Sequence, residues 1–179
     1  MGKDVAIVGL YCDFLAHPKQ SATNMLGSLL KQLVNSGGIP EQIREAFQKA
    51  EREFGGRSLP LSDLVAILKK TITSLPRLFI CVDALDECIP NHRRDLLESL
   101  RQIVALSPNI RVFLTGRPHV KQEIVRCFSQ FVQLPLSPTH GDIRSYLKVR
   151  LDDDPDPDAM DDELRADIMR IIPETVGGM

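Results

Sequence analysis

The chain has 179 residues, of which 43% are hydrophobic and 26% are charged, and its formal net charge is −2. This composition excludes a disordered or fibrous chain and is typical of one globular domain with a small appendage. Eight of the 24 acidic residues lie between Asp152 and Glu163, where no Lys or Arg occurs, so the rest of the chain is weakly basic. This small excess of basic residues is compatible with a phosphate ligand, but it is too small to predict nucleic-acid binding.

The apolar runs and the cysteines indicate in which part of the cell the protein is expected. The longest purely apolar runs are far shorter than the roughly 18 residues that a membrane-spanning helix needs, so we expect no membrane span. The four cysteines, Cys12, Cys81, Cys88 and Cys127, never approach the C-x-x-C spacing of a metal or redox motif. We therefore expect buried, reduced thiols and, by default, a cytoplasmic location.

Four short segments have the composition of β-strands. Val5–Cys12 and Leu78–Val82 are continuous apolar runs, which is typical of parallel strands covered by helices on both faces. Ile110–Leu114 is predicted to be the third strand, and the Pro-interrupted segment Phe131–Leu136 the fourth.

Segments with helical periodicity lie between and after these strands, with apolar residues that recur about every 3.6 positions. They are Met25–Val34, Ile43–Phe54, Leu61–Leu75, Leu96–Val104, Val120–Phe128, Ile143–Leu151 and Leu164–Ile172. Strands that alternate with helices predict an α/β fold with a parallel sheet. Because the pattern is purely helical after Ser137, we divide the chain into an α/β core over residues 1–137 and a helical part over residues 138–179.

Three carboxylates follow the second predicted strand, in the run LFICVDALDE: Asp83, Asp86 and Glu87. This arrangement has the form of a Walker B element. An acid at the tip of a rigid strand can hold a Mg²⁺-bound water, and a following acid can orient or deprotonate the attacking water. The alternative is that the acidic turn only caps the next helix.

A second polar group follows the third predicted strand, where the chain continues Thr115-Gly116-Arg117-Pro118. Ligands of open α/β sheets bind beyond the carboxyl ends of the strands, so we expect Thr115 and Arg117 to lie beside Asp83 and Asp86. A guanidinium there can bind the oxygens of a terminal phosphate. The alternative is that Arg117 only pairs with Asp86 or Glu87.

Two other sets of polar residues are expected to be unremarkable in function. Arg93 and Arg94, near the start of a predicted helix, are predicted to be surface charges. The histidines are far apart in sequence and have no Cys or carboxylate partner at metal-binding spacing.

Together, these segments resemble the nucleotide-binding domain of the NACHT branch of signal-transduction NTPases. The most similar members are fungal NACHT proteins with a nephrocystin-3-like amino-terminal domain. The resemblance is carried by VAIVGLYCDF, NMLGSLLKQL, RLFICVDALDEC, RVFLTGRP, and DIRSYLKVRL with DPDPDAMDDELRADI. It implies a three-layer, P-loop NTPase-like α/β fold that binds Mg²⁺ and ATP or GTP.

The resemblance also implies a role for each candidate residue. Asp83 is the metal-binding residue, which holds Mg²⁺ through water. Asp86 and Glu87 are the catalytic residues, which position the hydrolytic water. Thr115 and Arg117 form the first sensor and bind nucleotide together with Asp83, with Arg117 on the γ-phosphate.

The sequence departs from the family in one essential element. A nucleotide-binding NACHT domain has a G-x-x-x-x-G-K-[ST] loop before the strand that VAIVGLYC resembles, and these 179 residues contain none. We therefore expect an incomplete sheet that lacks the first strand and the P-loop, followed by the start of a helical subdomain. The expected function is that of a truncated NTPase module, inactive by itself. The alternative is a nucleotide-independent interaction module, and a homo-oligomer is compatible with both.

Overall fold

The computed structural model describes residues 5–35, 41, 44–45, 48, 52, 59–73, 75–155 and 160–176. These residues form two compact units, one up to Phe131 and one from Val132 onward. The helix predicted across Ile43, Phe47, Ala50 and Phe54 depends on four positions that lie outside the described residues.

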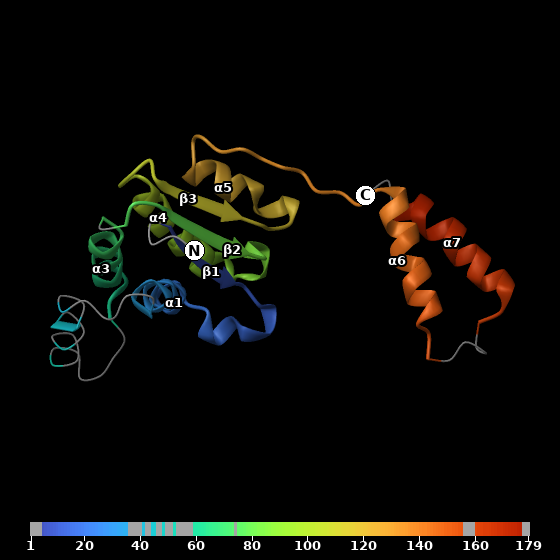
Figure 1. Ribbon diagram of the computed structural model, residues 1–179, viewed down its shortest axis with the longest axis horizontal. Helices are drawn as coiled ribbons and strands as arrows, with labels where there is room; N and C mark the ends of the chain where they lie inside the picture. The colour runs from blue at the N-terminus through green and yellow to red at the C-terminus, as the bar shows by residue number, and fades with distance from the viewer. Residues whose placement is uncertain are drawn as a thin grey trace. The chain divides into compact units, whose positions relative to one another are not determined.

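The first unit is built on a parallel sheet of three strands, β1 (Ala6–Tyr11), β2 (Leu78–Asp83) and β3 (Ile110–Leu114). The strands lie in the order β1-β2-β3, side by side in Figure 1. The first three predicted strands and the α/β class are therefore confirmed.

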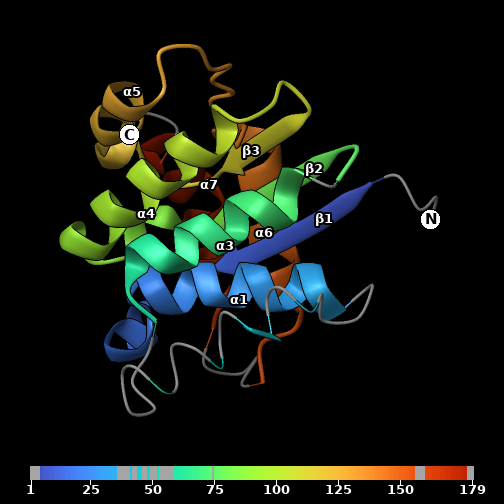
Figure 2. The same ribbon diagram turned by 90° about the vertical axis from the view of Figure 1, so that its left-hand side faces the viewer.

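The long helices of this unit lie on the same side of the strands (Figure 2). They are α1 (Ala22–Asn35), α3 (Leu61–Thr73) and α4 (Pro90–Val104). Parallel strands are joined by right-handed crossovers, and each new strand here is added on the same side of the previous one. Both crossovers therefore place their helices on the same face of the sheet.

Short helices complete the unit. They are η1 (Phe14–Lys19), η2 (Leu85–Glu87), η3 (Pro118–Val120) and α5 (Lys121–Cys127). The single-turn helix η2 directly follows β2, and η3 with α5 follows β3. These connections carry the polar residues discussed below.

The two faces of the sheet are buried very differently. On the helix-covered face, Val8 and Ile80 are 3% and 1% exposed. On the opposite face, which we call the open face (Ile7, Tyr11, Phe79, Cys81 and Phe113), Ile7 is 59% and Phe113 58% exposed. The expectation that β1 is covered on both faces is wrong, because neither crossover reaches the open face.

A side chain from α1 occupies part of the outer edge of β1. Gln32 accepts a hydrogen bond from the Gly9 N–H through Oε1 (2.9 Å) and donates one from Nε2 to the Gly9 carbonyl (2.8 Å). The amide of Gln32 thus bonds the backbone of Gly9 as a neighbouring strand would.

The prediction of a fourth strand at Phe131–Leu136 is wrong. Residues 131–136 are assigned to no strand, and Leu134 and Leu136 are 71% and 91% exposed. Pro135 has no backbone N–H to donate to a neighbouring strand. An apolar composition favours an extended segment, but a strand also needs a neighbouring strand with which to pair.

The second unit contains two packed helices, α6 (His140–Asp152) and α7 (Asp162–Val176), as predicted. A capping box starts α6: the Asp142 N–H donates to the Thr139 hydroxyl (3.1 Å), and the Thr139 N–H donates to the Asp142 carboxylate (2.8 Å). Arg165 of α7 pairs with Asp152 of α6. None of the described helices in either unit has the length and apolarity needed to cross a membrane.

Candidate functional site

Asp83 and Thr115 meet where β2 and β3 end. The Thr115 hydroxyl donates a hydrogen bond to Asp83 Oδ1 and accepts one from the Ala84 N–H (2.9 Å). The Thr115 N–H donates to the Val82 carbonyl (2.9 Å), which continues the pairing of the two strands. The hydroxyl therefore fixes both the carboxylate of Asp83 and the first peptide of the turn that follows it.

A left-handed residue turns the chain after Asp83. Ala84 has φ 53° and ψ 46°, a conformation that costs a residue with a Cβ about 1–2 kcal/mol. Leu85 is fully buried, and its N–H donates a hydrogen bond to the Thr115 carbonyl (2.9 Å). These two features hold the next turn in place. This geometry brings Asp86 and Glu87 of η2 to the end of β3.

Asp86 and Arg117 form the second contact between the two strand ends. Asp86 Oδ1 accepts a hydrogen bond from the Arg117 N–H (3.2 Å), and Asp86 Oδ2 lies 3.3 Å from Arg117 Nε. Arg117 Nη2 lies 3.7 Å from Glu87 Oε1. The Asp86 side chain is only 8% exposed, whereas that of Arg117 is 73% exposed. The ion pairing considered as an alternative role for Arg117 is thus present.

Gly116 leaves room for tight packing at this point. A Cβ here would lie 3.0 Å from Val120 Cγ2, so the Val120 side chain would have to move slightly, and 3.4 Å from Asp86 Oδ1, which is close to ordinary van der Waals contact. The glycine between Thr115 and Arg117 was part of the sequence pattern, but its packing role follows only from the three-dimensional contacts.

All five predicted site residues therefore lie at the carboxyl edge of the sheet, linked across β2 and β3. They present three carboxylates, a hydroxyl and a guanidinium. Within the described part of the chain, no group of three or more His, Cys, Asp or Glu side chains is placed to hold a metal ion. Mg²⁺ binds through one or two carboxylates and retains waters, with further ligands from substrate phosphates. The single carboxylate of Asp83 is consistent with that mode of binding. A site in which protein atoms supply all the metal ligands would need more carboxylates than this.

The prediction that Arg93 is a surface charge is wrong. Its side chain is 7% exposed and binds Glu123 of α5 in two places, at 2.9 Å from Nε and 2.6 Å from Nη2. Its Nη1 donates to the Cys88 carbonyl (2.7 Å). The hydrogen bonds from Arg93 lower the pKa of the Glu123 carboxyl.

Helical spacing could have revealed this burial. Arg93 lies three and four positions before Leu96 and Leu97, on the apolar side of α4. Arg94 is exposed, as predicted.

A pair of cysteines lies next to the acidic turn. Cys12 and Cys88 are both buried, at 0% and 2% exposed. The Cys88 thiol, together with burial and the nearby charges of Asp83 and Asp86, raises the pKa of Cys12. The Cys12 thiol lowers the pKa of Cys88. Sequence spacing gave no signal that the two residues lie near the same turn, because 75 residues stand between them along the chain.

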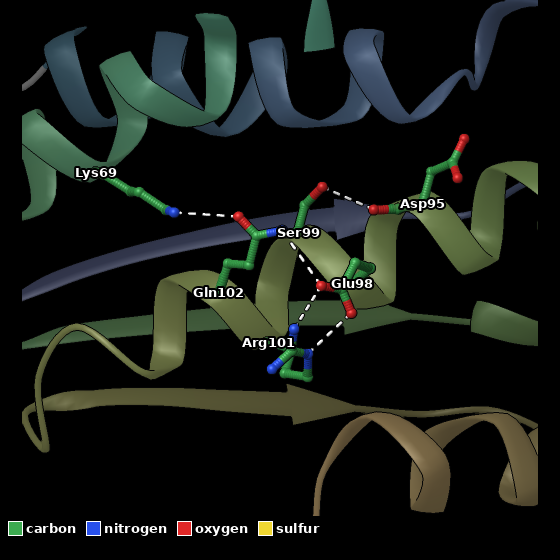
Figure 3. Close-up of polar contacts among 6 residues, drawn as sticks. All are labelled: Lys69, Asp95, Glu98, Ser99, Arg101 and Gln102. Carbon is green, nitrogen blue, oxygen red and sulfur yellow. Dashed lines mark hydrogen bonds and ion pairs between the residues drawn. The ribbon is translucent and has the colours of Figure 1, made fainter. Parts of the chain in front are cut away.

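An open groove of about 410 Å³ lies between α3 and α4 on the helical layer, apart from the predicted site residues. Its polar residues bond one another (Figure 3): Lys69 donates to Gln102 (3.1 Å), and Gln102 donates to Glu98 (3.2 Å). Hydrogen bonds from Arg101 and Gln102 lower the pKa of Glu98 to about 2. The side chains of Lys69, Glu98 and Gln102 are therefore already paired, and we assign the groove no ligand.

Residues 2–117 match the family described as "Nephrocystin 3, N-terminal". No curated protein and no solved structure matches the chain significantly.

Proposed function

Because the chain belongs to the family of nephrocystin 3 N-terminal domains, we propose that it carries the magnesium- and water-handling edge of a NACHT-type nucleotide-binding NTPase. The observation that supports this most strongly is the double contact between strand ends, Asp83 with Thr115 and Asp86 with Arg117. Ligands of open α/β sheets bind beyond this edge.

Each residue has a specific part in the proposed site. Asp83, oriented by Thr115, holds a Mg²⁺ ion through water. When bound, this ion neutralises phosphate charge and supports attack on the terminal phosphate. Asp86 and Glu87 position the attacking water and accept its proton. Arg117 binds the oxygens of the terminal phosphate of ATP or GTP.

Phosphate binding by Arg117 has to compete with the ion pairs described above. Arg117 contacts Asp86 and Glu87, yet most of its side chain is exposed, so the guanidinium can rotate toward an anion without unpacking the core. In the proposed site, Arg117 therefore stays paired with Asp86 and Glu87 until a phosphate replaces these carboxylates.

We further propose that the chain does not turn over nucleotide by itself, because its sequence contains no phosphate-cradling loop. Phosphoryl transfer depends on positioning and electrostatic stabilisation of the transferred group, and both require that cradle. We expect phosphate release from MgATP by the wild type to equal release by Asp83→Asn. Linear release above that variant would contradict this part of the proposal.

A binding experiment tests the site itself. In an amide NMR titration with MgATP, the resonances of Asp83, Thr115 and Arg117 are expected to shift together. Asp83→Asn should abolish these shifts, whereas Asp95→Asn, which changes an exposed carboxylate on α4, should leave them unchanged. Shifts that are equal in both variants would reject the proposed magnesium and nucleotide site.

One observation favours a second candidate, a nucleotide-independent interaction module. The open face exposes Ile7, Tyr11 and Phe113, and exposed apolar patches of this kind mark interaction sites. This function predicts self-association that MgATP does not change and that Phe113→Ser weakens in sedimentation equilibrium. A monomeric wild type that binds MgATP would favour the first candidate.

A further inference from the structure

We propose that the outer edge of β3 is a docking site for a second copy of this chain, which adds its residues 131–136 to the sheet as a further strand. The two copies exchange this segment, so that each gives one strand and receives one. The proposal goes beyond the nucleotide site, because it requires neither Mg²⁺ nor nucleotide. It concerns the edge of the sheet and not the open face.

The outer edge of β3 carries backbone groups that can pair with another strand. β3 lies at one end of the strand order (Figure 1). The Asn109 carbonyl and the Thr115 N–H bond the backbone of β2 (3.2 and 2.9 Å), so the odd-numbered residues of β3 direct their backbone groups toward β2. Successive residues of a strand direct these groups to opposite sides, so those of Val112 and Leu114 point outward. Among the described residues, neither has a hydrogen-bond partner on that side.

The start of β3 is already paired on its outer side. The Ile110 N–H donates to the Ser107 carbonyl (3.2 Å), and the Ile110 carbonyl accepts a hydrogen bond from Arg111 Nη1 (3.1 Å). A docking strand therefore finds a short stretch of edge, with the N–H and C=O groups of two residues to bond.

Residues 131–136 have the exposure pattern of a strand that lacks a sheet. Val132, Leu134 and Leu136 are 87%, 71% and 91% exposed. Side chains two positions apart lie on one face of an extended chain, so these three form a single apolar face. Phe128, which ends α5, has φ −124° and ψ 110°, so the chain leaves this helix in an extended conformation. An extended segment of this kind is suited to strand addition at a sheet edge.

Pro135 determines which side of the segment can pair. Pairing through the odd-numbered residues would lack one donor, because proline has no N–H. Pairing through Val132, Leu134 and Leu136 keeps every donor on the paired side and turns Pro135 outward, where a strand tolerates proline. The outward proline also hinders the addition of yet another strand. The exchange therefore ends at two copies.

A second copy supplies the edge that the segment lacks in its own chain. Residues 131–136 pair with no strand of the molecule to which they belong. Each molecule thus has one unpaired segment and one unpaired edge, and a two-fold arrangement of two molecules satisfies both at once. Exchange of an identical element between copies is a low-cost route to a dimer.

The test measures the dissociation constant of the full chain by sedimentation equilibrium. Leu134→Pro removes the middle donor of the paired side, so each dimer loses two edge hydrogen bonds. We expect the dissociation constant to rise at least about tenfold. Gln133→Pro is the matched control, because its N–H points away from β3, and its dissociation constant should stay close to that of the wild type. Both positions are exposed and lie outside helices and strands, so neither change disturbs the core. Equal effects of the two variants, or a wild type that stays monomeric throughout its range of solubility, would overturn the proposal.

Amide hydrogen exchange locates the contact. The N–H groups of Val112 and Leu114 should exchange more slowly as the concentration of the wild type or of Gln133→Pro increases, but not in Leu134→Pro. Slow exchange that does not depend on concentration would indicate pairing within one chain and would overturn the proposal. Association through the open face would leave both N–H groups in fast exchange, which would overturn it as well.

Discussion

The same three strands make both faces of the sheet, yet only one face is buried. Ile80 in β2 is 1% exposed and packs under the helices, whereas Ile7 in β1 is 59% exposed on the open face. Hydrophobicity does not explain this difference, because both residues are isoleucine. The direction in which the crossovers run decides which side of the strands becomes the core.

The largest expected effect comes from the same substitution on the two faces. Ile80→Ala should lower the free energy of unfolding by about 2–5 kcal/mol, because it opens a cavity in a packed core. Ile7→Ala should change it by only about 0.5 kcal/mol, since the side chain is already in water. Urea unfolding followed by circular dichroism measures both values. Equal losses would show that another surface covers the open face in solution.

A second prediction extends the comparison to the two sides of α4. Arg93→Ala should destabilise the fold by about 3 kcal/mol, because it removes the buried partner of Glu123 and the hydrogen bond to the Cys88 carbonyl. Arg101→Ala, which breaks the half-exposed pair with Glu98, should leave the free energy of unfolding close to that of the wild type. The same urea experiment compares them, and a similar loss in both variants would contradict the difference in burial.

The third prediction concerns acid stability. The pKa of Glu123 is lowered in the folded state by its hydrogen bonds from Arg93, so the pair stabilises the fold above the unfolded-state pKa of Glu. This contribution is lost as the pH falls through the lower, folded-state pKa. Glu123→Gln should therefore flatten the decline in the unfolding midpoint between about pH 5 and pH 3. Asp95→Asn, which changes an exposed carboxylate of α4, is the control and should change the decline less.

The smallest expected effect is a gain, at the turn where the sheet ends. Ala84→Gly should raise the free energy of unfolding by about 0.5 kcal/mol, because glycine adopts a positive φ without the Cβ penalty. The same change at Ala66, an exposed position inside α3, should instead lower it by about 1 kcal/mol. A loss at both positions would show that Ala84 is not strained in solution.

Local patterns predicted the elements that form the first unit. The apolar runs gave three strands correctly, and helical periodicity gave α1, α3 and α4. Phe131–Leu136 failed because strand composition alone cannot supply a pairing partner, and Pro135 weakens any pairing. Burial of β1 on one face only was also missed, since it depends on the order in which strands join the sheet.

The convergence of Asp83, Thr115 and Arg117 followed from topology, because parallel strands end at one edge of a sheet. The internal ion pairs of Arg117 were anticipated only as an alternative to phosphate binding. The two-point bond between Arg93 and Glu123 joins residues that are 30 positions apart. Contacts of this kind depend on packing, which no single-sequence pattern encodes.

Gln32 protects one point on the outer edge of β1. An exposed strand edge can pair with another chain, and successive additions lead to aggregation. The side-chain amide of Gln32 bonds both backbone groups of Gly9, so a foreign strand could pair along β1 only after breaking these two hydrogen bonds.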